Sequence, residues 1–276
     1  MEDKKKLVQE KYANIAGQSK EFNAGSCCGA TGCCGDGSYT IFSEDYSNLD
    51  GYNPDADMNL GCGIPTSFAN IKPGDTVIDL GSGAGNDCFV ARAMVGDSGQ
   101  VIGIDFTKEM IEKAIDNADK LGFKNVQFRL GDIENMPVTT NKADVVISNC
   151  VINLVPDKEK VFSEIYRVLK GGGHFCISDV VLVGEDLPPA IQEAAEMYAG
   201  CVSGALHMDD YLGIIVKTGF ESLKVLKKKP IVIPDEILGM YLDSDGIKDF
   251  KSSGTGIFSI TVYAEKPKTC CCGCDC

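Results

Sequence analysis

Short runs of Val, Ile and Leu alternate with amphipathic stretches in the sequence from Lys72 to about residue 183. An apolar run without polar interruptions is typical of a strand covered on both faces, and helices between such strands connect them in parallel. The sequence therefore predicts an α/β fold with a doubly wound, mostly parallel, Rossmann-like sheet. We expect strands at residues 76–80, 101–105, 126–130, 144–148 and 174–182, and helices near 87–95, 107–121 and 157–170.

The sequence on either side of this region follows a different pattern. Residues 1–72 form an N-terminal arm, with a helical pattern at 4–15 and a loop rich in Cys and Gly at 27–37. After residue 183 we expect a helical region at 187–219, a strand at 221–229, an irregular stretch and a strand at 256–266. The predicted divisions are the arm (1–72), a central domain (73–184), a C-terminal α+β region (185–268) and a Cys-rich tail (269–276).

The charge and the apolar content exclude several classes of function. There are 26 Lys and Arg against 40 Asp and Glu, a formal net charge of -14, which would repel the phosphate backbone of a nucleic acid. No apolar run approaches the ~20 residues that span a membrane, and the first fifteen residues lack the continuous apolar core of a secretion signal. We therefore expect a cytoplasmic protein that binds neither nucleic acid nor membrane.

Fourteen cysteines are unusual for such a chain. A disulfide framework is typical of short secreted chains, and the length and the α/β pattern both argue against one here. Thiols that stay reduced are soft ligands, which select soft, thiophilic elements over hard ions. The cysteines thus give the first indication of a ligand.

A glycine-rich loop follows the first predicted strand. It runs from Gly81 to Asn86, and Asn86 stands where the dinucleotide-binding pattern has its third glycine, which disfavours a nicotinamide or flavin cofactor. Acidic residues lie near the ends of three predicted strands, at Asp79, Asp105 and Asp132. Acids there can accept hydrogen bonds from ribose hydroxyls and an adenine amino group. The pattern therefore predicts an adenosine site without a pyrophosphate.

These motifs resemble those of the class I S-adenosylmethionine methyltransferases. The matching segments are DLGSGAGND, IGID and GDIENMP, within roughly residues 64–183. The resemblance implies that the cofactor is S-adenosylmethionine and that the central domain binds it. It also implies the cofactor-binding residues: Asp79, Gly81, Ser82 and Gly83 for the methionine part, Asp105 for the ribose, Asp132 and Ile133 for the adenine, Met110 packed on the ring, and Asn149.

A cysteine stands where the methyl acceptor is expected. The fourth predicted strand ends in SNCVINL, at the edge that faces the cofactor in a doubly wound sheet. This segment lacks the Asn-Pro-Pro-aromatic motif typical of enzymes that methylate exocyclic amines or amides. Cys150 lies there instead, and Cys62 and Cys201 have comparable settings before the first strand and after the fifth. Free cysteines often only fill a core, and we give that interpretation to Cys88 and Cys176.

The segments around Cys62, Cys150 and Cys201 are GCGIP, SNCVINL and AGCVSGA, and they are similar to those of the arsenite S-adenosylmethionine methyltransferases. This widens the resemblance to roughly residues 39–265, with one departure at Ile64, where many relatives have a polar residue. The resemblance implies that Cys62, Cys150 and Cys201 bind trivalent arsenic and act in catalysis. It also implies that the arm and the C-terminal region contribute to substrate binding.

Three thiols suit the chemistry of trivalent arsenic, which is soft, binds sulfur in a trigonal pyramid and keeps a lone pair at the apex. The lone pair can attack the sulfonium methyl in line, and no general base is needed. Methylation oxidises arsenic, and nearby thiols can return two electrons by closing a disulfide. By its spacing from Cys62, Cys34 matches the family's fourth cysteine, while Cys27, Cys28 and Cys33 remain open alternatives. The expected partners are arsenite, methylated arsenicals and a thiol reductant such as glutathione or thioredoxin, and we expect a monomer.

Two other functions remain open at this level. One is a methyltransferase for a small carbon or oxygen nucleophile, which would need a catalytic acid or base and would leave the cysteines idle. The other is a thiol-rich protein that binds metals or metalloids without catalysis, for which the tail sequence CCCGCDC is suggestive. A buffer of that kind has no need of an intact adenosine site.

Overall fold

The computed structural model describes residues 2–17, 44–194 and 201–268. Its centre is a seven-stranded sheet in the order β3-β2-β1-β4-β5-β7-β6. β1 to β5 pair in parallel, and β7 pairs antiparallel with both β5 and β6. The strands are β1 Thr76–Leu80, β2 Gln100–Asp105, β3 Val126–Leu130, β4 Ala143–Asn149, β5 Leu169–Val183, β6 Glu221–Ile231 and β7 Gly256–Glu265. The predicted doubly wound, mostly parallel sheet is confirmed.

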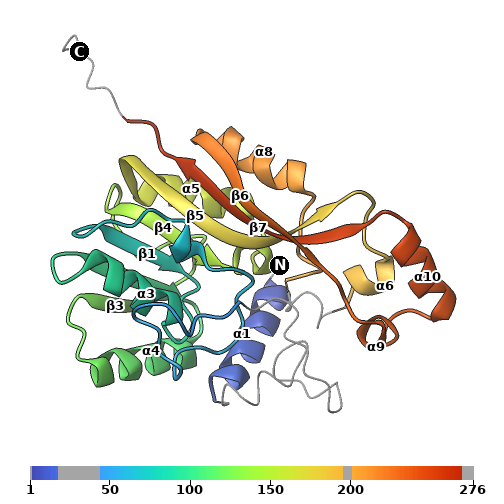
Figure 1. The fold of residues 1–276 in the computed structure, drawn as a ribbon, viewed down its shortest axis with the longest axis horizontal. Helices are drawn as coiled ribbons and strands as arrows, with labels where there is room; N and C mark the ends of the chain where they lie inside the picture. Colours follow the sequence, from blue (N-terminus) through green and yellow to red (C-terminus); the bar gives the residue numbers. More distant parts are fainter. Residues whose placement is uncertain (1, 18–43, 195–200, 269–276) are drawn as a thin grey trace, which may run out of the picture.

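Helices cover both faces of this sheet (Figure 1). On one face Val77 and Val101 pack with side chains of α3 (Asn86–Val95), α4 (Lys108–Leu121) and α1 (Glu2–Ala16). On the other face Ile78 and Ile102 pack with α5 (Lys158–Val168) and α8 (Met208–Thr218). Successive residues of a strand point to opposite faces, so unbroken Val and Ile runs supply both cores at once. The predicted strands and helices of the central region therefore form as expected.

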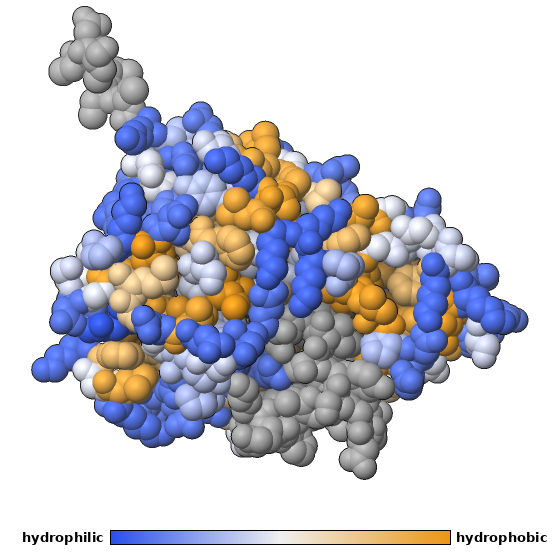
Figure 2. All heavy atoms as spheres, viewed as in Figure 1, coloured by the Kyte–Doolittle hydropathy of each residue, from blue (hydrophilic) through white to orange (hydrophobic). Residues whose placement is uncertain are grey.

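A third apolar cluster lies beyond the carboxyl end of the parallel strands. It joins α1, through Val8, to the three cysteines of the predicted arsenic site and to the short helices α6 (Pro189–Gln192) and α9 (Asp235–Leu238). Hydrophilic side chains cover much of the face in Figure 2, with hydrophobic patches between them, one of them near α6 and α9. This cluster is the part of the core that is built around the site.

Some predicted elements differ from the structure. The stretch after β6 was expected to be irregular, but it contains α9 and α10 (Ser244–Ser252). α10 begins after Asp243, whose side chain accepts a hydrogen bond from the backbone N–H of Gly246, a good N-terminal cap. The expected helical region at 187–219 is helical only in α6 and α8 within the described residues, and α5 ends before the predicted residue 170 because β5 begins at Leu169.

β6 and β7 join the same sheet as the central strands, so the sheet runs across the predicted boundary at residue 184. Among the described helices, none has the length and apolar content required to cross a bilayer.

Candidate active site

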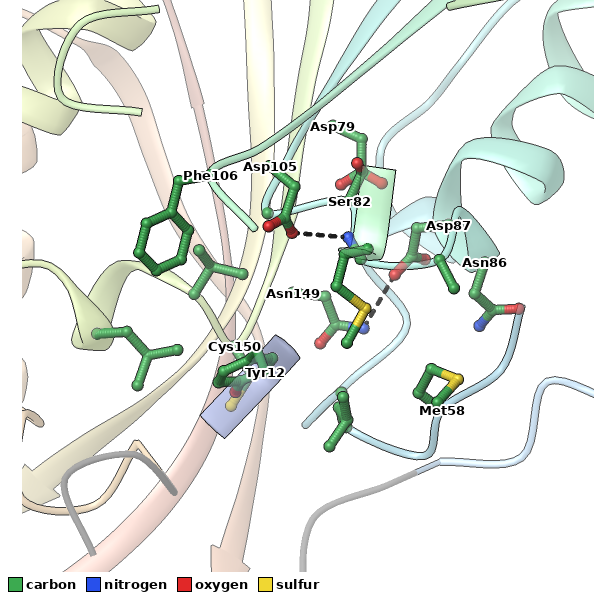
Figure 3. Close-up of a pocket in the computed structure, with 18 of the residues that line it drawn as sticks. Tyr12, Met58, Asp79, Ser82, Asn86, Asp87, Asp105, Phe106, Asn149 and Cys150 are labelled. Carbon is green, nitrogen blue, oxygen red and sulfur yellow. Dashed lines mark hydrogen bonds between the residues drawn. The ribbon is translucent and has the colours of Figure 1, made fainter. Parts of the chain in front are cut away.

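A pocket opens at the carboxyl ends of β1, β2 and β4, the edge where ligands bind in open α/β sheets (Figure 3). It holds about 1150 Å³ of space between atoms, including some at its open mouth. The lining includes every residue predicted to bind the cofactor and also Cys150. The structure therefore brings the predicted cofactor residues and one predicted arsenic ligand into a single cavity.

The glycine-rich loop forms one wall of the pocket. The backbone N–H groups of Gly81 and Ser82 both donate to the carbonyl of Ile104, at 2.8 and 3.0 Å, which ties the loop to the neighbouring strand β2. Gly81 and Gly83 have positive φ angles of 66° and 52°. A Cβ atom on Gly81 would lie 2.5 Å from the side chain of Val151, whereas one on Gly83 would meet nothing within 4 Å. Gly83 therefore borders open space on the ligand side.

Replacing Gly83 by Ala should reduce cofactor binding more than folding. The left-handed backbone conformation costs a non-glycine residue about 1 to 2 kcal/mol, and the added methyl group would enter space beside the loop that the cofactor needs. We expect at least about tenfold weaker S-adenosylmethionine binding in calorimetry. Chemical denaturation should show only the loss due to backbone strain, and unchanged cofactor affinity would place the cofactor elsewhere.

Two buried acidic side chains, Asp79 and Asp105, line this end of the pocket. Asp105 is 7% exposed, and its oxygens accept hydrogen bonds from the backbone N–H groups of Thr107 at 2.8 Å and Gly83 at 3.0 Å. Burial raises the pKa of Asp105, and those donors oppose the rise. Burial and the neighbouring Asp87 raise the pKa of Asp79 well above its usual value. Acids held in this way are stabilised by a cation, which suits the sulfonium and ammonium groups of S-adenosylmethionine.

Unsatisfied polar atoms also fit this cofactor. Within the described part of the chain, the hydroxyl of Ser82 and the side-chain oxygen of Asn86 are buried without a hydrogen-bond partner. Both residues line the pocket. Buried polar groups without a partner are rare in proteins, so these two indicate a polar ligand beside the loop.

The end of the pocket near Asp132, predicted to bind the adenine, contains a contact that sequence reasoning missed. Lys5 of α1 forms ion pairs with Glu134 and with Asp132, the latter at 2.6 Å. Gln9, one turn further along α1, donates to the carbonyl of Phe106 at 2.9 Å. Helix α1 was expected from its pattern, but its position over the pocket depends on contacts between residues more than 90 positions apart. No local signal in the sequence could have indicated this.

The three predicted arsenic ligands meet in the apolar cluster beyond the strands. Cys62, Cys150 and Cys201 are 1%, 4% and 3% exposed. The thiol of Cys150 contacts those of Cys201 and Cys62, and the Cys201 Sγ also donates to the carbonyl of Cys150 at 2.9 Å. The hydroxyl of Ser259, on β7, donates to the carbonyl of Cys62 at 2.6 Å. Three segments far apart in the sequence thus bring their thiols together.

Two of these cysteines have strained backbones. Cys150 and Cys201 have φ angles of 62° and 66°, in the left-handed region that residues other than glycine rarely adopt and that is concentrated at functional sites. The contacts with Cys201 and Cys62, together with burial, raise the pKa of Cys150 well above its usual value. Burial raises the pKa of Cys62 as well. The raised pKa values favour the protonated thiols of Cys62 and Cys150 in the absence of a ligand.

The thiol cluster is not a ready-made metal centre. Among residues 2–17, 44–194 and 201–268, no three His, Cys, Asp or Glu side chains have the arrangement that would hold a metal ion.

Other predicted cysteines have different positions. Cys34 and its alternatives Cys27, Cys28 and Cys33 lie outside the described residues, as does the tail from residue 269. Cys176 is buried in the core, as predicted. Cys88 is buried there too, but its thiol also donates to Asp79 at 3.2 Å. Cys88 therefore contacts a residue predicted to bind the cofactor as well as filling the core.

Comparison with known proteins identifies the family. Residues 71–229 match a family model described as a methyltransferase domain. The chain is 41% identical to an arsenite methyltransferase from Halobacterium salinarum, over 96% of this chain and 67% of that protein. The chain belongs to the arsenite methyltransferases. Its cofactor is S-adenosylmethionine, as predicted.

Other members of the family agree. The arsenite methyltransferase of Aquipseudomonas alcaligenes is 34% identical over 84% of this chain, and the match covers 66% of that protein. A crystal structure of an arsenic(III) S-adenosylmethionine methyltransferase from Chlamydomonas reinhardtii matches with a TM-score of 0.63 and 36% identity, over 76% of this chain and 68% of that one. The chain thus spans about two thirds of the length of these arsenite methyltransferases.

Proposed function

We propose that this chain transfers methyl groups from S-adenosylmethionine to trivalent arsenic held by Cys62, Cys150 and Cys201. The observation that carries the proposal is the position of Cys150. Cys150 lines the cofactor pocket, and its thiol contacts the thiols of Cys62 and Cys201. A small acceptor on these thiols would therefore lie beside the cofactor. The family's name and the soft character of sulfur ligands support arsenic as that acceptor.

Arsenite can bind by exchanging its hydroxyl groups for thiolates. Each As–O bond that breaks is replaced by an As–S bond, and the thiol proton leaves with the hydroxyl as water. Three exchanges release three waters and leave no net proton, so raised pKa values at Cys62 and Cys150 do not oppose the reaction. The apolar side chains of Val8 and Leu154 pack in the same cluster, which keeps water from reversing the exchange.

Methyl transfer then needs little from the protein beyond position. The cofactor supplies a methyl group on a positively charged sulfur that is already a good leaving group. Arsenic held by three thiolates would still have its lone pair. That pair would form the As–C bond as the S–C bond breaks, so arsenic would rise by two oxidation levels. Holding both reactants in contact accounts for most of such a rate enhancement. The position of Cys150 supports this, because it immediately follows Asn149 at the end of β4 and lines the same pocket.

A further methylation needs arsenic to be reduced again. Two thiols can supply two electrons by forming a disulfide, and a thiol reductant such as glutathione or thioredoxin would reopen it. Cys34 remains our candidate for the additional thiol. We also retain the prediction that the arm and the C-terminal region contribute to substrate binding.

Product analysis tests the proposal directly. The purified protein with arsenite, S-adenosylmethionine and a thiol should release methylated arsenic species, separated by chromatography and quantified by their arsenic content. Cofactor consumption should depend on arsenite. Turnover of a quinone or phenol in place of arsenite would instead support the alternative of a small carbon or oxygen nucleophile, and arsenite binding without products would support a non-catalytic protein.

A further inference from the structure

We propose that Asn149 is a positioning residue that holds Cys62 against Cys150, so that, if the proposed function holds, it determines whether the site accepts arsenite or only arsenic that is already methylated. Sequence reasoning placed Asn149 among the cofactor residues, and it does line the pocket (Figure 3). Its side-chain amide, however, is engaged with the loop that carries Cys62.

The amide of Asn149 binds the backbone of this loop at Cys62 and at the following residue, Gly63. Its Oδ1 accepts hydrogen bonds from the backbone N–H of Cys62 at 3.0 Å and of Gly63 at 3.3 Å. Its Nδ2 donates to the carbonyl of Gly63 at 2.8 Å. One side chain thus satisfies three backbone polar groups of two adjacent residues, in a segment 87 residues away in sequence.

A second layer orients the amide. Nδ2 of Asn149 also lies 2.8 Å from the hydroxyl of Tyr46 and 3.1 Å from the carboxylate of Asp87. Tyr46 in turn donates to Asp87 or to the carbonyl of Gly63, both at 2.9 Å. The two amide protons of Asn149 are shared among these acceptors. Because acceptors surround Nδ2 and N–H donors face Oδ1, the amide is fixed in one orientation.

The glycines on either side of Cys62 make the close approach possible. A Cβ atom on Gly61 would lie 2.4 Å from Nδ2 of Asn149, and one on Gly63 would lie 2.5 Å from the hydroxyl of Ser178. The loop can therefore lie directly on the end of β4. Asn149 and Cys150 are adjacent, and each holds another cysteine of the cluster. The side chain of Asn149 binds the loop that carries Cys62, and the backbone carbonyl of Cys150 accepts the thiol of Cys201.

The third thiol is held without Asn149. Cys201 bonds directly to the carbonyl of Cys150, so this pair should survive loss of the amide. The Cys62 loop would lose its three hydrogen bonds with Asn149 and keep the bond from Ser259 and the contact between the Cys62 and Cys150 thiols. Arsenite has three exchangeable positions, but methylarsenite has two and needs only two thiols. Loosening Cys62 should therefore affect the two substrates differently.

The test compares both substrates in Asn149→Ala and in the milder Tyr46→Phe. We expect kcat/KM for arsenite to fall about 10- to 100-fold in Asn149→Ala, the size expected for a misplaced group, and less in Tyr46→Phe. For methylarsenite it should change by less than about threefold. Mass spectrometry after alkylation should show Cys62 losing its protection by arsenite, while Cys150 and Cys201 keep theirs. Calorimetry should show unchanged S-adenosylmethionine affinity.

Asn153→Ala is the matched control. Asn153 is also buried in this segment, and its Nδ2 donates to the carbonyl of Val180 at 2.6 Å, away from the Cys62 loop. This variant should lose stability without changing the ratio of the two substrates. If Asn149→Ala does not fold, Tyr46→Phe alone decides, and the absence of a selective loss for arsenite in Tyr46→Phe would overturn the inference.

Two further outcomes would overturn it. Weaker cofactor binding in Asn149→Ala would show that Asn149 binds the cofactor. Equal losses of activity for both substrates, with Cys62 still protected from alkylation, would show that its role is purely structural. Cys62→Ser, assayed in parallel, separates this inference from the proposed function. Normal arsenite turnover in Cys62→Ser would refute the three-thiol site itself, whereas a selective defect in Cys62→Ser alone would refute only the role of Asn149.

Discussion

Replacing Cys150 or Cys201 by Ser should abolish methylation of both arsenite and methylarsenite. A serine hydroxyl is a hard ligand and too weakly acidic to replace a thiolate on arsenic. These two cysteines are bonded to each other through the Cys150 carbonyl, and they form the pair that would hold an arsenic with only two exchangeable positions. We expect losses of at least about 1000-fold in kcat/KM, because the reacting atom is no longer held. Cys62→Ser should lose arsenite turnover only.

The control for this series is Cys176→Ala rather than a variant of Cys88. Cys176 lies within β5 in the core, and its substitution should lower stability without abolishing turnover. The thiol of Cys88 donates to Asp79, so a variant there would disturb the cofactor site. Turnover of arsenite and methylarsenite by all variants should be measured together with thermal unfolding. Full arsenite turnover in either the Cys150 or the Cys201 variant would contradict the three-thiol site.

The second large effect should follow from Asp105→Ala, which should weaken S-adenosylmethionine binding about 10- to 150-fold. A hydrogen bond to a charged group contributes about 1.5 to 3 kcal/mol, and each 1.36 kcal/mol corresponds to a tenfold change. Each oxygen of Asp105 already accepts one backbone N–H, from Thr107 and from Gly83. Its remaining acceptor sites are those expected to take the ribose hydroxyls. The loss should be measured by calorimetry.

Arsenite binding should be largely unchanged in this variant, because Asp105 is not among the thiol contacts. Asp116→Ala serves as the control, since Asp116 is an exposed acid on α4, outside the pocket lining. It should bind the cofactor normally. An Asp105 variant with wild-type cofactor affinity would show that the adenosine is bound elsewhere.

The central sheet could be predicted from the sequence because each of its strands is encoded locally. TVIDL predicts β1 on its own, and the glycines after it predict the loop. The same reasoning failed for α10, whose nine residues include no buried side chain. Within α10, Ile247 and Phe250 are partly buried against the third apolar cluster. One such pair in SDGIKDFKS is too short a repeat to indicate a helix, and only the cap at Asp243 indicates where the helix begins.

The site divides in the same way. Asp79 and Asp105 were recognisable because each has a fixed place relative to a strand end. The contributions of Lys5, Tyr46 and Ser259 were not, because each depends on how distant segments pack. Ser259 lies on β7, almost 200 residues after the cysteine it contacts. The residue types needed at a site can be read from sequence, but which side chains support them is decided by tertiary contacts.

The left-handed backbone at Cys150 and Cys201 has a consequence for how these positions would evolve. At such φ angles glycine and asparagine are the residues that the backbone favours, and most others are disfavoured. A cysteine persists there only while selection for its thiol outweighs that preference. In a descendant that no longer handles arsenic, drift at these two positions should run toward Gly or Asn rather than toward Ala, Ser or Val. Cys62 lies outside this region of backbone space, so its replacements would carry no such bias, and paired Gly or Asn at 150 and 201 would mark relatives that have lost the activity.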